Sequence, residues 1–365
     1  MLKYLIRIQP LGLLYGSSGR FLSPENLVGR SGQQFPPTAA TLSGLFAYFF
    51  QQNNQPELLE NLLLSGPFWA KEEDPQNFYV PTPFNCLVQD KVIKDQMVFD
   101  GENWKVWSDD EKLKDKKILK TPPDDKFQKG TWISVKDWEK LQNPKGEKPE
   151  VETSPWKFLP HLHPRLQHGQ RRVATEVEEN QGSLFLENAV QLDPEICLVY
   201  LSNTKITDGW YRFGGEGHLV KLTCEPLEDP GKSLLNKDLE RSFALVVPAV
   251  WGSNRQSYRS PEYDATEDRL SWPENSIDSL LTQRPQPFRY RLGKRKTDQP
   301  EKQTQPPGLL SRGRYAVPAG SVYVLEKPLK KWQDWETSWF PQEGYYSLKR
   351  WGCGLALPLN VVVKS

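Results

Sequence analysis

Hydrophobic and polar residues alternate in several short stretches of this chain, and such alternation predicts β-strands with one buried face. The first stretch covers residues 2–14, with Leu5 and Ile6 near its centre. Further strands are predicted near residues 183–192, 195–201, 218–222 and 243–250, and near 315–325 with a turn that interrupts it. Residues 345–363 are predicted to be a second glycine turn, at Gly352 and Gly354, that leads into an apolar strand. Because Asp193-Pro194 separates the second stretch from the third and favours a turn, we expect those two strands to form a hairpin.

One stretch has a clear helical period. Its apolar residues follow the spacing i, i+3, i+4, i+7, which directs a single stripe toward a core: Leu42, Leu45, Phe46 and Phe49. Thr38 is the predicted N-cap. Shorter helical patterns span residues 57–64, ending at Ser65-Gly66-Pro67, and residues 277–281. Many strands and few helices favour an α+β fold, and tandem ferredoxin-like units are the most economical architecture.

The domain organisation follows from changes in sequence character. Residues 1–230 are predicted to form a first ferredoxin-like domain, and residues 238–365 a second one. Between about residues 71 and 160, lysine and aspartate alternate densely, prolines recur and hydrophobic periodicity is poor. We interpret this part as an insertion of hairpins and loops into the first domain.

The composition restricts the classes of protein to which this chain can belong. A chain of 365 residues is long enough for two domains, and its net charge of +1 points to no particular partner. With 37% hydrophobic residues, 31 prolines and 13 tryptophans, we expect many loops held down by aromatic anchors. The 4 cysteines are widely spaced and form neither a zinc pattern nor a disulfide framework. Without a signal-peptide core or a membrane-spanning run, we expect a soluble cytoplasmic protein with no metal and no cofactor.

A glycine-rich turn, Gly214-Gly215-Glu216-Gly217, precedes the strand at residues 218–222. Glycines permit positive φ and let another chain approach the backbone closely. Arg212 and His218 flank the turn with positive or polarisable groups. An ordinary hairpin turn explains the same residues, so both interpretations stay open.

Two other glycine motifs do not fit. A dinucleotide-binding fingerprint needs a third glycine where Val220 stands, and a helix where a strand is predicted. Gly231-Lys232-Ser233 resembles the end of a phosphate-binding P-loop, but Pro226 occupies the place of its first glycine.

Two further stretches are basic. Residues 161–172 hold three histidines and three arginines and no acid: His161, His163, Arg165, His168, Arg171 and Arg172. A loop facing a polyanion explains this stretch better than a metal site, because the histidines have no nearby carboxylate or thiol. Residues 284–314 carry nine lysines and arginines against two acids, and we expect a flexible basic loop within them.

Several segments, taken in order, resemble the RAMP superfamily of CRISPR-associated RNA-binding proteins. The nearest likeness is to the subunit of type III-B (Cmr) effector complexes that holds the 5′ tag of the guide RNA. Two segments are the most characteristic, Gly214–Gly217 and Pro318–Tyr323. The others are Pro37–Leu45, Leu64–Phe68, Tyr79–Pro83, Gln170–Glu176, Gly182–Phe185, and Phe213 before the glycine turn.

The resemblance implies two ferredoxin-like domains and a non-catalytic subunit in antiviral defence. Such a subunit grips the 5′ tag of the guide RNA, and docks on the polymerase/cyclase-like large subunit and on filament RAMP subunits. This chain departs from the family in its long insertion and in residues 202–209, where the family has a helix. The candidate RNA-binding residues are Arg20, Arg30, His168, Gln170, Arg171, Arg172, Arg212, Gly214, Gly215, His218, Arg289, Arg291, Arg312 and Arg314.

A rival hypothesis is a metal-independent endoribonuclease, since a sister branch of the superfamily cleaves CRISPR repeat RNA. His163 or His168 would then act as general base beside Arg171 or Arg172. The sequence offers no clear second catalytic partner, so we assign no catalytic residue. A purely structural subunit is the third alternative, but it leaves the clustered arginines unexplained.

Overall fold

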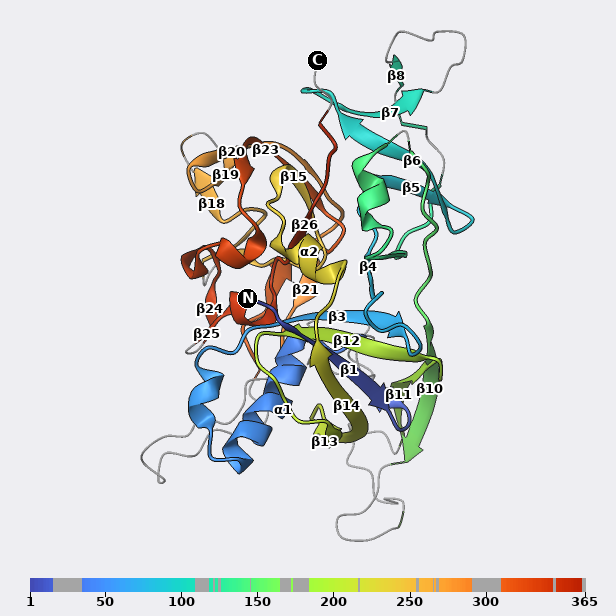
Figure 1. The fold of residues 1–365 in the computed structure, drawn as a ribbon, viewed down its shortest axis with the longest axis vertical. Helices are drawn as coiled ribbons and strands as arrows, with labels where there is room; N and C mark the ends of the chain where they lie inside the picture. The colour runs from blue at the N-terminus through green and yellow to red at the C-terminus, as the bar shows by residue number, and fades with distance from the viewer. Residues whose placement is uncertain are drawn as a thin grey trace.

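The structure is a computed structural model that describes most of the chain. The described residues are 1–15, 35–108, 118–120, 122–123, 126–144, 146–164, 172, 184–215, 217–253, 256–264, 266, 269–290, 310–343 and 346–362. Their strands far outnumber their helices, which confirms the expected α+β composition (Figure 1).

The first sheet has seven strands among the described residues, in the order β13-β14-β1-β12-β3-β4-β9, and each neighbouring pair is antiparallel. Four of its central strands lie side by side in the order β14-β1-β12-β3. By their order in the chain, these four are the fourth, first, third and second. The bounds are β1 (Tyr4–Pro10), β3 (Leu64–Lys71), β4 (Tyr79–Pro81), β9 (Trp132–Ser134), β12 (Ile196–Ser202), β13 (Gly209–Phe213) and β14 (His218–Pro226).

Both faces of this sheet are buried. On β12, Leu198 and Tyr200 face α1 (Ala39–Gln52), whereas Val199 and Leu201 face the core shared with the rest of the molecule. Alternate residues of a strand point to opposite faces, so a strand covered on both sides is apolar throughout. Each fully buried side chain of this size contributes about 1.5–3 kcal/mol. Helix α1 covers one face of the sheet, and the C-terminal half of the chain lies beyond the other (Figure 1).

The second sheet belongs to the C-terminal half and runs β18-β19-β20-β23-β15-β26 among the described residues. Its strands β26, β15, β23 and β20 repeat the fourth-first-third-second order of the first sheet. Aromatic rings fill its core, with Trp272 5.4 Å from Trp251 and 5.2 Å from Trp335 between ring centroids. The bounds are β15 (Glu240–Leu245), β18 (Glu262–Asp264), β19 (Arg269–Trp272), β20 (Asn275–Leu281), β23 (Val322–Leu329) and β26 (Ala356–Pro358).

The segment at 71–160 is integrated into the fold rather than attached to its edge. Strands β4 and β9 extend the first sheet, and β5 (Cys86–Gln89), β6 (Val92–Phe99), β7 (Trp104–Ser108) and β8 (Ile118–Lys120) form a sheet of their own near the C-terminus (Figure 1). Trp138, in the short helix η3 (Trp138–Gln142), is buried and donates from Nε1 to the Pro358 carbonyl at 2.9 Å. The expected tryptophan anchors therefore include one between this segment and the C-terminal half.

The remaining elements are short helices, two-stranded ribbons and a three-stranded sheet with the order β10-β11-β2. They are β2 (Leu14–Tyr15), η2 (Pro56–Leu59), β10 (Trp156–Pro164), β11 (Leu184–Leu192), α2 (Gly231–Asn236), β16 (Trp251–Gly252), β17 (Ser257–Tyr258), β21 (Gln286–Phe288), β22 (Arg314–Ala316), η5 (Trp332–Asp334), η6 (Thr337–Trp339), β24 (Gln342–Glu343), β25 (Tyr346–Ser347) and η7 (Leu348–Trp351). Between the two predicted domains lies α2. The domain boundaries stay a prediction, because one hydrophobic core spans both sheets.

The predicted hairpin around Asp193-Pro194 is wrong, although both of its strands exist. Strand β11 pairs with β10 and β2, whereas β12 pairs with β1 and β3 in the first sheet. A turn signal shows where the chain changes direction, but it does not determine which partner each strand finds. Here the two strands end in different sheets.

Two of the helix predictions fail for a similar reason. Only the 3₁₀-helix η2 forms within residues 57–64, and Ser65-Gly66-Pro67 lies inside β3 instead of ending a helix. Residues 277–281 form part of β20, which pairs with β23. Tertiary pairing overrides local spacing in short apolar stretches. Helix α1 is confirmed at 39–52, with Thr38 at its N-cap position but without a side-chain capping hydrogen bond.

The C-terminal half docks on the first sheet through a second glycine turn. Gly352 has φ +74°, and a Cβ there would lie 2.3 Å from the Ser65 Oγ and 2.6 Å from the Ser65 Cα. Next to this turn, Lys349 is buried, and its ammonium bonds the carbonyls of Gln333 and Trp335. Burial lowers the pKa of Lys349 to about 8. Gly352 itself is required for two reasons: its φ is positive, and a side chain there would overlap Ser65 of β3.

No helix in the described part of the chain is long and apolar enough to cross a membrane. Within the same residues, no three histidine, cysteine or acidic side chains gather as metal ligands would.

The closed glycine turn yields a stability prediction. We expect Gly352→Ala to destabilise the protein by about 2 kcal/mol or more, because it combines positive φ with overlap on Ser65. Gly44, inside α1 with open space around its Cα, is the matched control. Gly44→Ala should leave stability unchanged or raise it by up to about 1 kcal/mol. Thermal and urea unfolding of both variants measure the difference, and equal melting curves would contradict this account of the junction.

Candidate functional site

The first glycine turn closes the hairpin of β13 and β14, as the sequence predicts. Phe213 pairs with His218, and the Gly217 N–H donates to the Gly214 carbonyl at 3.2 Å. Gly214 and Gly217 have φ of +77° and +67°, so the turn itself explains these two glycines. The predicted glycine turn is confirmed as a hairpin.

Gly215 is different. Its φ lies outside the left-handed region, and a Cβ added there would meet nothing within 4 Å. Neither backbone conformation nor internal packing therefore requires a glycine at this position. Close approach by a molecule outside the chain would require one.

The turn lies beside the beginning of α1. A Cβ on Gly214 would be 3.8 Å from the Thr41 Cγ2, in the first turn of the helix. Helix N-termini favour anions, because their first N–H groups have no partner within the helix. The first turn of α1 contains no acidic residue, and Thr38 provides no side-chain cap. The backbone amides at the start of α1 thus lie beside the glycine turn at one end of the first sheet, in an arrangement that suits phosphate, and Arg212 projects from the opposite face of the hairpin.

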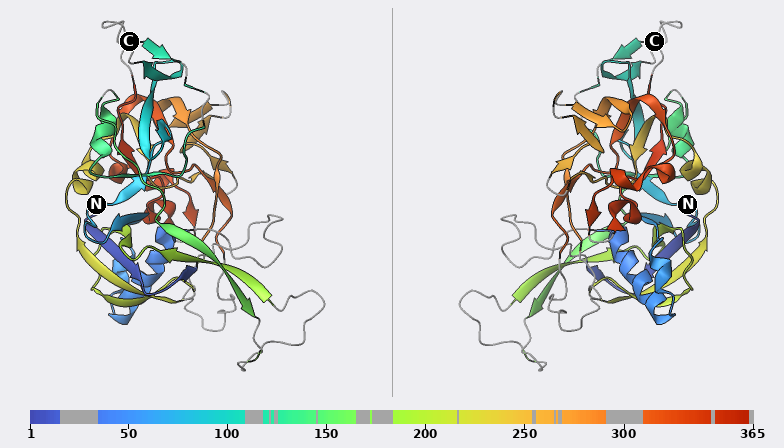
Figure 2. Two further views of the ribbon diagram at one scale, coloured as in Figure 1. Left: turned by 90° about the vertical axis from the view of Figure 1, so that its right-hand side faces the viewer. Right: turned by 90° about the vertical axis from the view of Figure 1, so that its left-hand side faces the viewer.

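Strands β10 and β11 form a long hairpin that extends away from the body of the molecule (Figure 2). His161 and His163 lie on β10, opposite residues Glu187 and Phe185 of β11. The basic stretch predicted at 161–172 therefore begins on this hairpin. Of its candidate residues, Arg172 is described and exposed, whereas His168, Gln170 and Arg171 lie outside the described residues.

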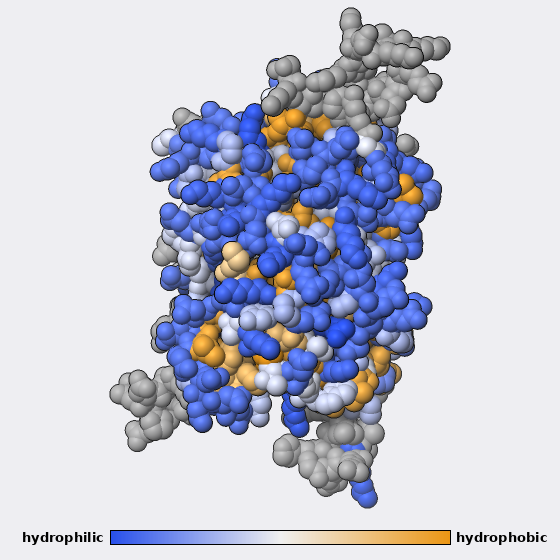
Figure 3. Space-filling view, in the orientation of Figure 1, coloured by the Kyte–Doolittle hydropathy of each residue, from blue (hydrophilic) through white to orange (hydrophobic). Residues whose placement is uncertain are grey.

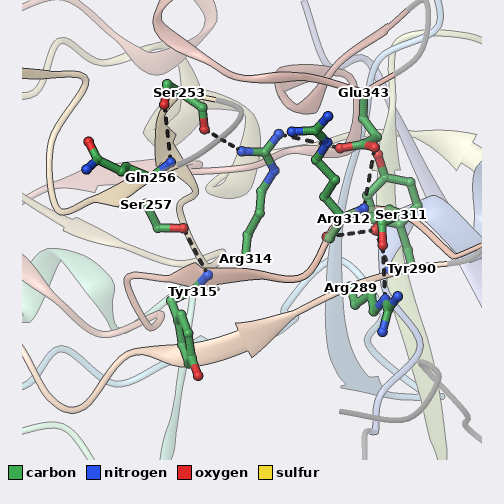
Figure 4. Close-up of polar contacts among 10 residues, drawn as sticks. All are labelled: Ser253, Gln256, Ser257, Arg289, Tyr290, Ser311, Arg312, Arg314, Tyr315 and Glu343. Carbon is green, nitrogen blue, oxygen red and sulfur yellow. Dashed lines mark hydrogen bonds and ion pairs between the residues drawn. The ribbon is translucent and has the colours of Figure 1, made fainter. Parts of the chain in front are cut away.

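The described ends of the basic stretch 284–314 are held together at their base (Figure 4). Strands β21 and β22 pair, and the Ser311 N–H donates to the Tyr290 carbonyl at 2.8 Å. The Arg289 Nε donates to the Ser311 carbonyl at 2.9 Å. Burial raises the pKa of Tyr290 above its ordinary range, so this phenol stays neutral at the base. The two described ends that flank residues 291–309 are thus joined to each other.

Arg312 and Arg314 lie two residues apart but in different environments. Arg314 is buried, with its Nη2 3.4 Å from the Glu343 Oε2 and its Nη1 donating to the Ser253 carbonyl at 2.7 Å (Figure 4). Arg312 is exposed, and its backbone N–H donates to the Glu343 Oε1 at 3.4 Å. These contacts give Arg314 a structural role, whereas the sequence suggested only a contact to RNA. Arg312 lies at the surface, with its side chain directed toward Glu343 (Figure 4).

The sequence of the chain matches one protein family over nearly its whole length. The family is described as "CRISPR-associated protein (Cas_Cmr3)", and its sequence profile matches residues 13–361. The chain belongs to the Cas_Cmr3 family. The resemblance stated from the sequence is confirmed at this level. No curated protein sequence matches this Cas_Cmr3 chain.

Solved structures with similar folds are distant in sequence. A "Cryo-EM structure of the Type III-B Cmr-beta bound to cognate target RNA and AMPPnP, state 1" contains a chain of 13% identity, with 88% of this chain and 86% of that chain covered and a TM-score of 0.44. A chain of the "Crystal structure of Csm1-Csm4 cassette in complex with cA4" has 10% identity, coverages of 100% and 99%, and a TM-score of 0.37. A chain of the "Crystal structure of Csm3-Csm4 subcomplex in the type III-A CRISPR-Cas interference complex" has 12% identity, coverages of 98% and 100%, and a TM-score of 0.34.

The structure brings some of the predicted residues of this Cas_Cmr3 protein together and separates others. Arg212, Gly214, Gly215 and His218 share the β13–β14 hairpin, whereas Arg289, Arg312 and Arg314 lie around the β21–β22 ribbon of the C-terminal half. Arg20, Arg30 and Arg291 fall outside the described residues.

Sequence reasoning missed Trp210, which is 58% exposed on the same hairpin as the glycine turn. Its spacing of two from Arg212 places both side chains on one face of β13. That spacing was visible in the sequence, but nothing there showed that this face is left uncovered.

The buried ion pair of Arg314 and Glu343 provides a second prediction. Removing one partner of a buried ion pair leaves the other charge uncompensated, which costs about 3–5 kcal/mol. We expect Arg314→Ala and Glu343→Ala each to lower the free energy of unfolding by about this amount. Arg284→Ala, which removes an exposed arginine of the same stretch, is the control and should change it by less than about 0.5 kcal/mol. Urea unfolding compares the three, and an Arg314→Ala variant as stable as Arg284→Ala would contradict the structural role of Arg314.

Proposed function

We propose that this Cas_Cmr3 family member is the non-catalytic subunit of a cytoplasmic type III-B CRISPR–Cas effector complex that holds the 5′ tag of the guide RNA. In this proposal it also contacts the polymerase/cyclase-like large subunit and filament RAMP subunits. Family membership supports the kind of complex. The position of Gly215 supports the RNA contact.

The glycine turn carries the proposal because it contains one glycine more than its geometry needs. A side chain at Gly215 would project into open space, so only an external ligand gains from its absence. Phosphate groups bind well where backbone amides are accessible and a cation is near. Arg212 supplies that cation from one face of β13, and the start of α1 supplies further amides on the opposite side of the hairpin. A single RNA strand that crosses the turn from one face to the other would use all three.

The strand order supports the tandem ferredoxin-like architecture that belongs to this proposal. Strands β14, β1, β12 and β3 are antiparallel in the fourth-first-third-second order of a ferredoxin-like sheet. Strands β26, β15, β23 and β20 repeat it. Residues 203–208 form no helix, in agreement with the departure from the family pattern noted in the sequence. We therefore treat the glycine turn and the basic stretch at 284–314 as parts of two related units.

The test is to add one methyl group at the turn. We expect Gly215→Ala to fold with wild-type stability and to bind a single-stranded RNA carrying the 5′ tag about tenfold more weakly. That loss corresponds to one charge-assisted hydrogen bond of about 1.5 kcal/mol. Gly214→Ala should instead lose about 1–2 kcal/mol of stability, because its φ is positive. Gly44→Ala is the control for a glycine in open space.

Fluorescence anisotropy titrations beside thermal melts separate these effects. A Gly215→Ala variant that binds the tag RNA as well as wild type would leave the turn with a purely structural role. In that case the RNA-binding proposal loses its main support.

The proposal also includes the absence of RNA cleavage by this chain. We expect no site-specific product when the purified full chain is incubated with labelled repeat RNA, with or without divalent metal ions. Denaturing gels would reveal a product. Cleavage that disappears in His163→Ala or His168→Ala would favour the endoribonuclease alternative instead.

A further inference from the structure

One face of the β13–β14 hairpin is open to solvent next to the glycine turn. Trp210 and Arg212 on β13 lie opposite Lys221 and Leu219 on β14, so all four share this face. The intervening residues point the other way and are packed toward α1. Among them, Tyr211 lies 6.1 Å from Phe49 between ring centroids, and Val220 is buried.

On the neighbouring strands β1 and β12, this side of the sheet is covered by the shared core, which includes Leu5 and Val199. The cover ends before the hairpin. Leu219 is 44% exposed, and Leu11, whose N–H donates to the Leu219 carbonyl at 3.0 Å, is 66% exposed. The face thus passes from buried core to an open apolar surface within a few residues of the turn. Figure 3 shows that the face of the molecule seen in Figure 1 is otherwise largely hydrophilic, with hydrophobic side chains in small separate groups.

Trp210 is exceptional among the tryptophans of this protein. It is 58% exposed, whereas the other tryptophans with described side chains are buried or partly buried and serve as anchors. An indole exposed to water loses the favourable free energy that tryptophan side chains usually gain from burial. Here it lies between Arg212 on its own strand and Lys221 across the hairpin. These four outward-facing positions hold two cations and no acid.

We propose that Trp210 is a stacking platform for one base of the bound RNA, with Arg212 and Lys221 on the phosphates to either side. This inference rests on the proposed function, since it extends the path of the RNA from the glycine turn onto the open sheet face. Exposed aromatic rings flanked by basic side chains are the usual means of holding single-stranded RNA, because a base stacks on the ring while the cations follow the backbone. Leu219 and Leu11 extend the apolar surface beneath the base.

A protein partner is the competing occupant of this face. The charges favour RNA, because both cations border the indole and neither has an acid among the four outward positions. The continuity with the glycine turn favours RNA as well: only residues 211–213 separate Trp210 from Gly214.

The experiment compares three substitutions of Trp210 in the full chain, with a 5′-tagged single-stranded RNA as the probe. We expect Trp210→Ala and Trp210→Leu to weaken RNA binding by about 10-fold to 100-fold, the range found when a stacking residue is removed. Trp210→Phe keeps a ring and should lose much less. Tyr48→Ala, which removes another exposed aromatic residue from α1, is the matched control and should bind as wild type does.

A second measurement isolates stacking from other roles. Abasic nucleotides are placed one at a time along the RNA, and one position should weaken binding to the wild type but not to Trp210→Ala. Equal affinities of wild type and Trp210→Ala for the intact RNA would overturn the inference. So would normal RNA binding by Trp210→Ala together with lost co-purification of other effector subunits, which would assign the face to a protein. If Gly215→Ala loses RNA while Trp210→Ala does not, the proposed function stands and the stacking inference alone fails. A wild-type chain that binds no RNA would overturn both.

Discussion

The fold depends on burying both faces of the first sheet. Helix α1 covers one face, where Leu198 and Tyr200 of β12 contact its apolar stripe. The other face, with Val199 and Leu201, packs into a core shared with the 71–160 segment and the C-terminal half. The first sheet therefore does not bury this face without the rest of the molecule. The single core across both sheets follows from this requirement, and so does the tight junction at Gly352, where a side chain would displace β3.

The same constraint explains where the molecule is left open. The shared core does not reach the end of the first sheet, so the β13–β14 hairpin keeps one uncovered face, on the side away from α1. The two glycine turns of the chain then have opposite roles. Gly352 is closed in by Ser65 and holds the halves together, whereas Gly215 faces open space and leaves room for a ligand. At both positions a glycine allows another group to come close to the backbone. The surroundings identify that group as Ser65 of β3 at Gly352 and, in our proposal, as a ligand outside the chain at Gly215.

Burial also separates basic residues that are close together in the sequence. Arg314 points inward from β22 to Glu343, while Arg312 stays at the surface two residues earlier. Basic residues that look equivalent in the sequence thus fall into two groups: some stabilise the fold, and others are candidate contacts to RNA. In the Cas_Cmr3 protein proposed here, the buried pair would hold the base of the basic stretch, and the exposed arginines would meet the RNA.

The sequence by itself determined the features that depend on neighbouring residues. Period-two alternation located the central strands β1, β12 and β14, the i, i+3, i+4 spacing located α1, and the glycine turn identified a hairpin, because each is a local property of the backbone. It could not determine which strands pair: Asp193-Pro194 joins two strands of different sheets, and residues 277–281 pair as a strand despite helical spacing. Burial is equally non-local. Only the tertiary structure decided that Arg314 lies inside, that Gly215 has no internal neighbour, and that Trp210 remains exposed.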